Sequence, residues 1–171
     1  DAHTLFRIDK EGKEHRVTSF AYETSNLRWD KETRTLYWSE SIPDERWSLK
    51  SGSKIRYMKE GEGRKRTLKN RGLLYNPALT GDVVSSVRYH ADGHSSIELS
   101  NWESGKTLKV VDAPDSLQVV DITWLKDEIF ATAISDNGYG IYRAGGISWD
   151  CVLRPQPVMI MDFGAIGDEL V

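Results

Sequence analysis

The chain has 171 residues, of which 39% are hydrophobic and 29% charged, a balance typical of a globular domain that buries a sizeable core. Its formal net charge of −3 argues against a nucleic-acid or anionic-membrane partner, since such partners are normally met by a basic excess. The single cysteine, Cys151, excludes an internal disulfide, and no run of eighteen apolar residues predicts a membrane-spanning helix. A single domain is therefore expected.

Short strand-like pieces separated by turns begin early in the chain, and the clearest set lies at 26–29, 35–38, 55–59 and 64–68. In the third piece Tyr57 lies on one side of the chain and Arg56 and Met58 on the other, which is the two-residue period of a β-strand. The Gly-rich stretch that follows it supplies the reversal that a hairpin needs. Four antiparallel strands over this length predict one blade of a β-propeller.

The same unit recurs along the chain with a period of about 40 to 50 residues, the spacing of a propeller array. The third-strand pattern is found at 5–9, 55–59, 96–100 and 140–144. The repeat predicts an all-β domain with a partial blade at 1–20, whole blades at 21–70, 71–115 and 116–156, and a partial blade at 157–171. Trp29 and Trp124 take equivalent places in the repeat, so both are expected to pack between blades.

The two ends of the chain fall in different phases of the repeat. The first partial blade contains only a third and a fourth strand, whereas the last contains a first strand and the beginning of a second. These halves could complete one blade shared between the termini and close a small ring, because closure removes open sheet edges. Alternatively the chain is a piece of a larger propeller. We expect the piece, since the sequence stops at Val171 inside an apparent strand.

Two local motifs carry a resemblance to a known family. Residues 29–34 and 79–82 stand where a Trp-Ser-Pro-Asp-Gly-Lys turn would be, and 55–57 and 141–143 stand at an Ile-Tyr strand. The pattern resembles the TolB-type PD40 class of WD40-like propeller repeats, although no copy keeps the full turn. The resemblance implies a β-propeller that is periplasmic or on the cell surface, and it extends to the propellers of tricorn-like proteases.

The connections between second and third strands are the expected binding site, because in a meander they return to the same end of every blade. The longest of them, at 40–53, contains a tryptophan that favours an ordered loop. The candidate residues on this rim for a protein or peptide partner are Asp44, Arg46, Trp47, His90, His94, Asp136 and Asn137.

Other motifs favour structural roles. The basic run at 64–66 falls on a predicted outermost strand, where charge prevents edge pairing. The two histidines of 90–94 flank an Asp-Gly hairpin turn and are not expected to bind a metal. Residues 146–150 lack the closing glycine of a nucleophile elbow, and Cys151 is expected to be packed and inert. No catalytic residue and no cofactor is predicted.

Two functions remain open from the sequence. The first is a non-catalytic binding or scaffold module at the periplasm or cell surface. The second is a propeller that gates access to the catalytic domain of a larger tricorn-like or prolyl-oligopeptidase-like hydrolase. The continuation of the gene would separate these two hypotheses.

Overall fold

The computed structural model describes residues 3–25, 27–44, 51–69, 73–145, 148–160 and 163–171. Every regular element in these ranges is a β-strand, so the expected all-β fold is confirmed. A search of the same residues for a helix long and apolar enough to cross a membrane finds none.

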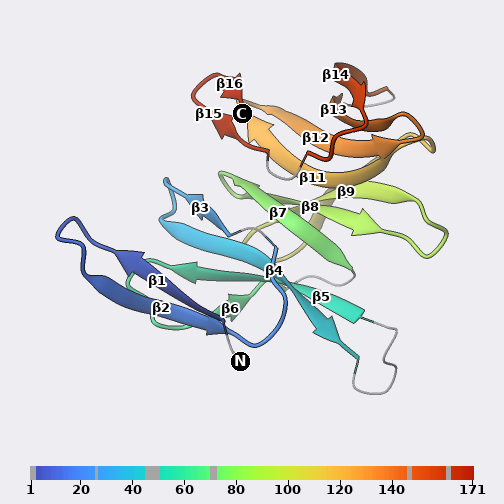
Figure 1. Ribbon diagram of the computed structural model, residues 1–171. Coiled ribbons are helices and arrows are strands. Elements are labelled where there is room, and N and C mark those ends of the chain that lie inside the picture. The colour runs from blue at the N-terminus through green and yellow to red at the C-terminus, as the bar shows by residue number, and fades with distance from the viewer. Residues whose placement is uncertain (1–2, 26, 45–50, 70–72, 146–147, 161–162) are drawn as a thin grey trace.

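Three antiparallel sheets of four strands follow one another along the chain, each a meander in sequence order (Figure 1). The first sheet contains β3 (Arg28–Asp30), β4 (Thr35–Pro43), β5 (Ser51–Lys59) and β6 (Arg66–Thr67). The second contains β7 (Leu74–Thr80), β8 (Val83–Tyr89), β9 (Ser95–Asn101) and β10 (Thr107–Asp112). The third contains β11 (Gln118–Leu125), β12 (Glu128–Ser135), β13 (Gly138–Ala144) and β14 (Asp150–Gln156).

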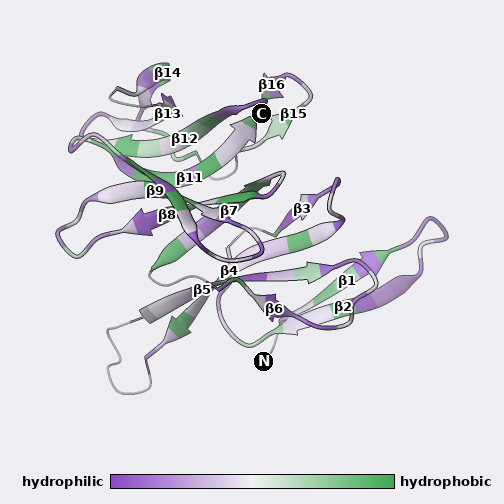
Figure 2. Cartoon of the chain, turned by 180° about the vertical axis from the view of Figure 1, so that it is seen from behind, coloured by the Kyte–Doolittle hydropathy of each residue, from purple (hydrophilic) through white to green (hydrophobic). Residues whose placement is uncertain are grey.

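A two-stranded sheet lies at each end of this row. The N-terminal sheet pairs β1 (His3–Ile8) with β2 (Glu14–Phe20), and the C-terminal sheet pairs β15 (Ala165–Ile166) with β16 (Glu169–Leu170). The two lie at opposite ends of the row in both views of the ribbon (Figures 1 and 2). The described termini therefore form two separate half-sheets, as expected of a piece of a larger propeller.

The connection expected at 40–53 is shorter in the structure than the sequence suggests. Strands β4 and β5 continue to pair as far as Pro43 opposite Ser51, so both ends of the predicted loop, 40–43 and 51–53, are part of the hairpin. Proline is tolerated here because Pro43 is the last residue of its strand.

The core lies between the sheets, which stack face to face, while the strands alternate hydrophobic and hydrophilic residues (Figure 2). One cluster joins the second and third sheets and includes Val87, Ile97, Ile122 and Ile129, each at most 7% exposed. A second cluster joins the first and second sheets through Tyr37, Ile55, Leu74 and Leu79. A third, smaller cluster holds β1 and β2 against the first sheet through Phe20, Trp38 and Met58.

Pairing defines the equivalent positions of the blades. Trp29 lies opposite Leu36 one residue before the end of the first strand, and Leu79, Trp124 and Ala165 hold the same place in the following sheets. Trp124 is packed as expected and donates its indole N–H to Ser85 Oγ at 2.8 Å. The expectation for Trp29 was wrong, because its side chain is 50% exposed.

A buried ion pair bridges the second and third strands of the first two blades, with its charges reversed between them. In the first blade Glu40 on β4 is 2% exposed and accepts from Arg56 Nε on β5 at 2.7 Å. In the second blade Arg88 on β8 donates through Nε at 2.8 Å to Glu98 on β9, which is 3% exposed. Glu40 and Arg88 are each the sixth residue of their strands, so the two pairs occupy the same site. In the third blade the strand position is held by Ala133.

Candidate functional site: a rim of interstrand turns

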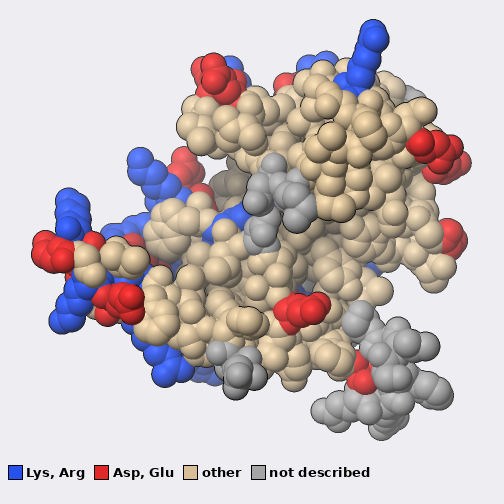
Figure 3. Space-filling model, viewed as in Figure 1, with Lys and Arg blue, Asp and Glu red and all other residues tan. Residues whose placement is uncertain are grey.

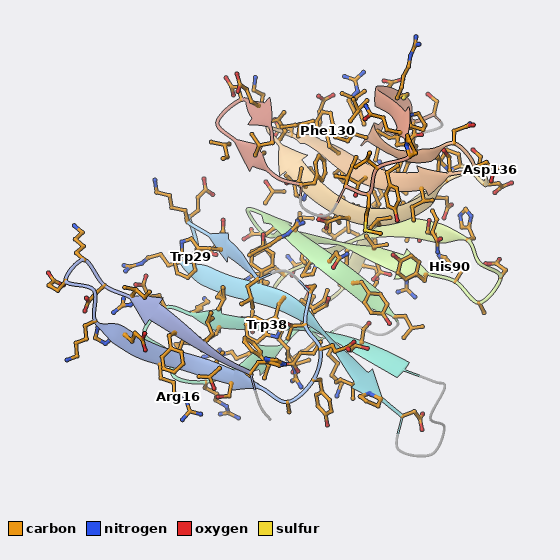
Figure 4. The ribbon with its side chains drawn as sticks, in the orientation of Figure 1. Arg16, Trp29, Trp38, His90, Phe130 and Asp136 are labelled. Carbon is orange, nitrogen blue, oxygen red and sulfur yellow. The ribbon has the colours of Figure 1, made fainter. Side chains whose placement is uncertain are left out.

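The β8–β9 and β12–β13 turns, which join second to third strands, lie along one edge of the stack (Figure 1). Asp44 directly follows β4, whereas Arg46 and Trp47 lie outside the described residues. His90 and His94 bound the turn between β8 and β9, and Asp136 and Asn137 form the turn between β12 and β13. His90 and Asp136 project at the same edge of the molecule (Figure 4).

The turn at 90–94 is a tight hairpin, as the Asp92-Gly93 pair predicts. His90 N–H donates to the carbonyl of His94 at 2.9 Å, and Gly93 N–H donates to the carbonyl of His90 at 3.1 Å. Gly93 has φ +88, the left-handed region in which an L side chain is strained. The Asp92 carboxylate accepts from His94 N–H at 3.0 Å, which fixes the backbone beneath the histidine.

The two imidazoles lie side by side, with ring centroids 5.7 Å apart. The Nε2 atom of His90 is 2.9 Å from Ser96 Oγ, so one ring nitrogen is held by the sheet. His94 lies 3.8 Å from carboxylate oxygens of both Asp112 and Asp115, which form ion pairs with it when the imidazole is protonated. Within the described ranges, no three His, Cys, Asp or Glu side chains are grouped as a metal would need.

A cavity of about 240 Å³ opens between the turns of the second and third blades. It brings together two of the residues predicted from the sequence, His94 and Asp136. Next to His94 in sequence, Ser95 Oγ accepts from Val119 N–H at 3.0 Å and joins β9 to β11. The other lining residues include Gly93, Asp115, Leu117 and Ser135.

The remaining candidates are placed differently. Asn137 lies in the turn next to this cavity, where its backbone N–H donates to Ser135 Oγ at 3.2 Å. Asp44 belongs to the first blade and does not line the cavity. Of the candidate residues on the rim, those that share a cavity therefore lie between the second and third blades.

Two residues of the basic run at 64–66 form contacts within the chain. Lys65 Nζ donates to the backbone carbonyl of Ser19 at 2.8 Å and lies 3.7 Å from buried Glu40, and Arg66 is 3.0 Å from Glu62. Lys and Arg gather at the end that carries β1 to β3 on the face shown in Figure 3. These contacts favour a structural role for the run.

Cys151 differs from its expectation. It lies on β14, the outermost strand of the third blade, and is exposed, as are nearly all residues of that strand. Its thiol contacts the carbonyl of Leu153 at 3.4 Å.

The sequence analysis did not predict an apolar hollow beside the N-terminal sheet. It measures about 640 Å³ and lies between the β1–β2 sheet and the first blade, with Leu5, Phe6, Val17, Trp29, Leu36 and Met58 in its lining. A second hollow, of about 590 Å³, is lined by the innermost strands of successive blades. Near it Arg28 of the first blade donates to both carboxylate oxygens of Asp121 of the third, at 2.7 and 2.6 Å. The larger hollow could have been predicted from the first partial blade, because a sheet with only a third and a fourth strand leaves the inner part of the neighbouring blade uncovered.

The sequence matches no protein family and no curated protein. The structure is similar to TolB from Acinetobacter baumannii, with 14% identity and a TM-score of 0.63 over 87% of this chain and 37% of that one. A chain of a nidogen/laminin complex gives 15% identity and 0.65, over 94% of this chain and 59% of that one. A puromycin-hydrolyzing peptidase of Mycobacterium tuberculosis gives 16% and 0.60, over 89% and 27%.

These likenesses establish the fold. The three four-stranded sheets are blades of a β-propeller, and the chain spans less than two thirds of each of the three similar structures. The TolB-type resemblance seen in the sequence is matched by a TolB structure among these neighbours.

Proposed function

We propose that the chain is a non-catalytic binding or scaffold module of the periplasm or cell surface, which recognises a protein or peptide partner through the rim of interstrand turns. The observation that carries the proposal is the convergence of turns at one edge, with His94 and Asp136 of neighbouring blades lining one cavity. Convergent polar groups around a concavity are typical of a recognition site. The TolB and nidogen/laminin neighbours support the same class of function.

The charged side chains around His94 would make the rim selective for its partner. Asp112 and Asp115 flank His94, and Asp136 faces the same cavity, so the centre is acidic with an imidazole in it. A basic or hydrogen-bonding peptide side chain is the complementary group. The candidate Arg46 and Trp47 would add the residue types that most often anchor interfaces.

The test uses binders of known sequence. Peptides selected from a displayed random library on the immobilised chain would be measured against three variants: His94→Ala with Asp136→Ala, Arg46→Ala with Trp47→Ala, and Lys65→Ala with Arg66→Ala. We expect either rim variant to weaken binding by about 10-fold or more, a loss of about 1.4 kcal/mol. The exposed pair Lys126→Ala with Asp168→Ala, at the opposite end of its strands, is the matched control and should bind like the parent chain.

Two outcomes would contradict the proposal. Loss of binding in the Lys65 and Arg66 variant alone, with all variants folded, would move the site to the basic edge. Equal binding by every variant would remove the rim from the function.

The peptidase neighbour favours a second function, a propeller that gates access to a hydrolase domain. The hollow lined by the innermost strands is the passage that this function would use. A Ser-His-Asp hydrolase encoded in the same gene would support gating, whereas a membrane barrel or a peptidoglycan-binding domain would support the recognition module.

A further inference from the structure

The outermost strands of the three blades differ in how their free edges are protected. β6 has two residues, Arg66 and Thr67, and β14 contains Pro155 and pairs irregularly with β13. β10, in the middle blade, has six residues, no proline and regular pairing with β9 from 109 to 112. It also leaves Leu108 55% and Val110 45% exposed. A very short strand, a proline and irregular pairing each discourage the addition of another strand, so β10 is the outer edge most open to it.

The backbone of β10 presents free hydrogen-bonding groups along this edge. Ala113 N–H donates to the carbonyl of Ser95 at 3.1 Å, which makes residue 113 a hydrogen-bonded position opposite β9. Hydrogen-bonded and non-hydrogen-bonded residues alternate in an antiparallel pair, so 109 and 111 also bond to β9, whereas Val110 and Asp112 direct their N–H and C=O groups outward. Within the described ranges, no backbone bond from outside the sheet reaches Val110 or Asp112.

A hollow of about 330 Å³ follows the same edge. Its lining includes the consecutive residues 109–114. Because consecutive side chains of a strand point to opposite faces, this hollow runs along the edge of β10 and not over one face of the sheet. It is also lined by Trp149, which directly precedes β14 of the third blade and packs against the core shared by the second and third sheets.

The indole N–H of Trp149 is buried and has no hydrogen-bond acceptor among the described residues. A buried donor without an acceptor is costly, and such groups are uncommon in folded proteins. The main-chain carbonyls of a strand added to β10 would enter the hollow that Trp149 lines, where one of them can accept from Nε1. The open edge and the unpaired indole are therefore satisfied by the same ligand, an extended polypeptide.

Two lysines indicate which polypeptide fits. Lys106 and Lys109 lie at the start of β10, are exposed and form no ion pair in the part of the chain that the structure describes. Lys109 also borders a hollow of about 620 Å³, whose acidic lining residues are Asp127, Glu128 and Asp150. Arg143 already holds the last two of these at 3.2 and 2.6 Å. The start of β10 therefore carries a surplus of positive charge, which attracts an acidic peptide and repels a basic one.

We infer that the free edge of β10 binds an extended acidic segment of a partner protein by strand addition. The main chain of that segment pairs with Val110 and Asp112, and one of its carbonyls accepts from Trp149 Nε1. A glutamate or aspartate of the segment lies beside Lys109, and apolar residues between its acidic residues cover Val110. The inference goes beyond the proposed function and does not depend on the rim of interstrand turns.

The probe is a fluorescent heptapeptide of alternating glutamate and valine, compared with one of alternating lysine and valine. Fluorescence anisotropy should show the acidic peptide binding at least about 10-fold more tightly than the basic one. Val110→Pro removes an outward N–H without removing a bond to β9, and should weaken binding of the acidic peptide by at least about 10-fold. Val152→Pro is the matched control, because Val152 is 54% exposed and lies unpaired between two paired residues of β14. It should bind like the parent chain.

Two further variants test the side chains. Trp149→Phe keeps an aromatic ring without the N–H and should also weaken binding. Lys109→Glu should reverse the preference, so that the basic peptide binds more tightly than the acidic one.

Hydrogen exchange locates the bound peptide on the parent chain. The acidic peptide should slow exchange of the Val110 and Asp112 amides by at least about 10-fold. If Val110→Pro fails to fold by circular dichroism, the acidic peptide N-methylated at every residue tests the same bonds, and it should bind at least about 10-fold more weakly. Equal binding of the acidic and basic peptides, no binding of the acidic peptide at millimolar concentration, or full binding by folded Val110→Pro would overturn the inference.

Discussion

At the scale of single residues, Trp29 and Trp124 show how one register position takes two environments. Both precede the end of a first strand, but only Trp124 faces a complete sheet, where Ser85 accepts its indole N–H. The sheet that precedes Trp29 consists of β1 and β2, which correspond to outer strands and leave the inner part of that face open. Its half-exposed indole is the consequence.

Truncation should separate the two tryptophans. Trp124→Ala should lower the free energy of unfolding by about 3 kcal/mol, the lower end of the range for a large buried aromatic, since Trp124 is only partly buried. Trp29→Ala should cost about 1 kcal/mol because half of its surface is already in water. Urea denaturation at low protein concentration measures both, and equal losses would contradict the assigned environments.

At the scale of the element, the buried ion pairs tie the second strand of a blade to the third. Glu40 and Glu98 are both nearly fully buried, and each is satisfied by further donors, Trp38 Nε1 at 3.2 Å for the first and Thr107 Oγ1 at 2.9 Å for the second. A buried charge left without its partner is costly, whereas a satisfied pair is tolerated. The second and third strands of each blade can therefore pair without a large cost only when both charged residues are present.

The reversed order of charges in consecutive blades predicts the outcome of a swap. Arg88→Glu or Glu98→Arg alone places like charges together and should cost about 3 to 5 kcal/mol, whereas the double exchange reproduces the order of the first blade and should restore most of the loss. Chemical denaturation of the four proteins measures the coupling. Glu128→Arg, on an exposed pair 3.2 Å from Arg143, is the control and should cost no more than about 1 kcal/mol.

Strands and turns were predictable because they depend on local alternation and on residues such as Asp92 and Gly93, whose geometry is set within the turn. Strand ends were less so: the extension of β4 to Pro43 depends on its pairing with β5, which no local pattern reveals. The rim could be placed from topology alone. The apolar hollow could not, since the exposure of Trp29 depends on which strands of the neighbouring sheet are present.

At the scale of the molecule, tyrosine hydroxyls at the contacts between sheets join the blades. Tyr37 OH accepts from Leu79 N–H of the next sheet, and Tyr89 OH donates to the carbonyl of Val119 at 2.9 Å. Burial raises the pKa of both phenols, because an ionised oxygen between the sheets loses its hydration. The folded protein therefore favours the neutral form of both phenols.

This shift makes stability sensitive to alkali. A folded-state pKa above the unfolded value of about 10 contributes stability that is fully present below that value and is lost as pH rises through the folded pKa. Urea midpoints measured from pH 8 to pH 11 should therefore fall, and Tyr89→Phe should reduce the fall. Tyr22→Phe removes a phenol that is 44% exposed and serves as the control. An identical alkaline decline in both variants would exclude the contact tyrosines as its cause.

The reversed ion pairs also bear on how a chain of similar strands avoids assembling incorrectly. Each blade offers hairpins of nearly the same length, so a second strand could pair with the third strand of a neighbouring repeat during folding. A hybrid of β4 with β9 would bury Glu40 beside Glu98, and a hybrid of β8 with β5 would bury Arg88 beside Arg56. Each correct pair is neutral, and each exchanged pair holds two like charges away from water. The reversed order of charges in consecutive blades therefore disfavours pairing between strands of different repeats.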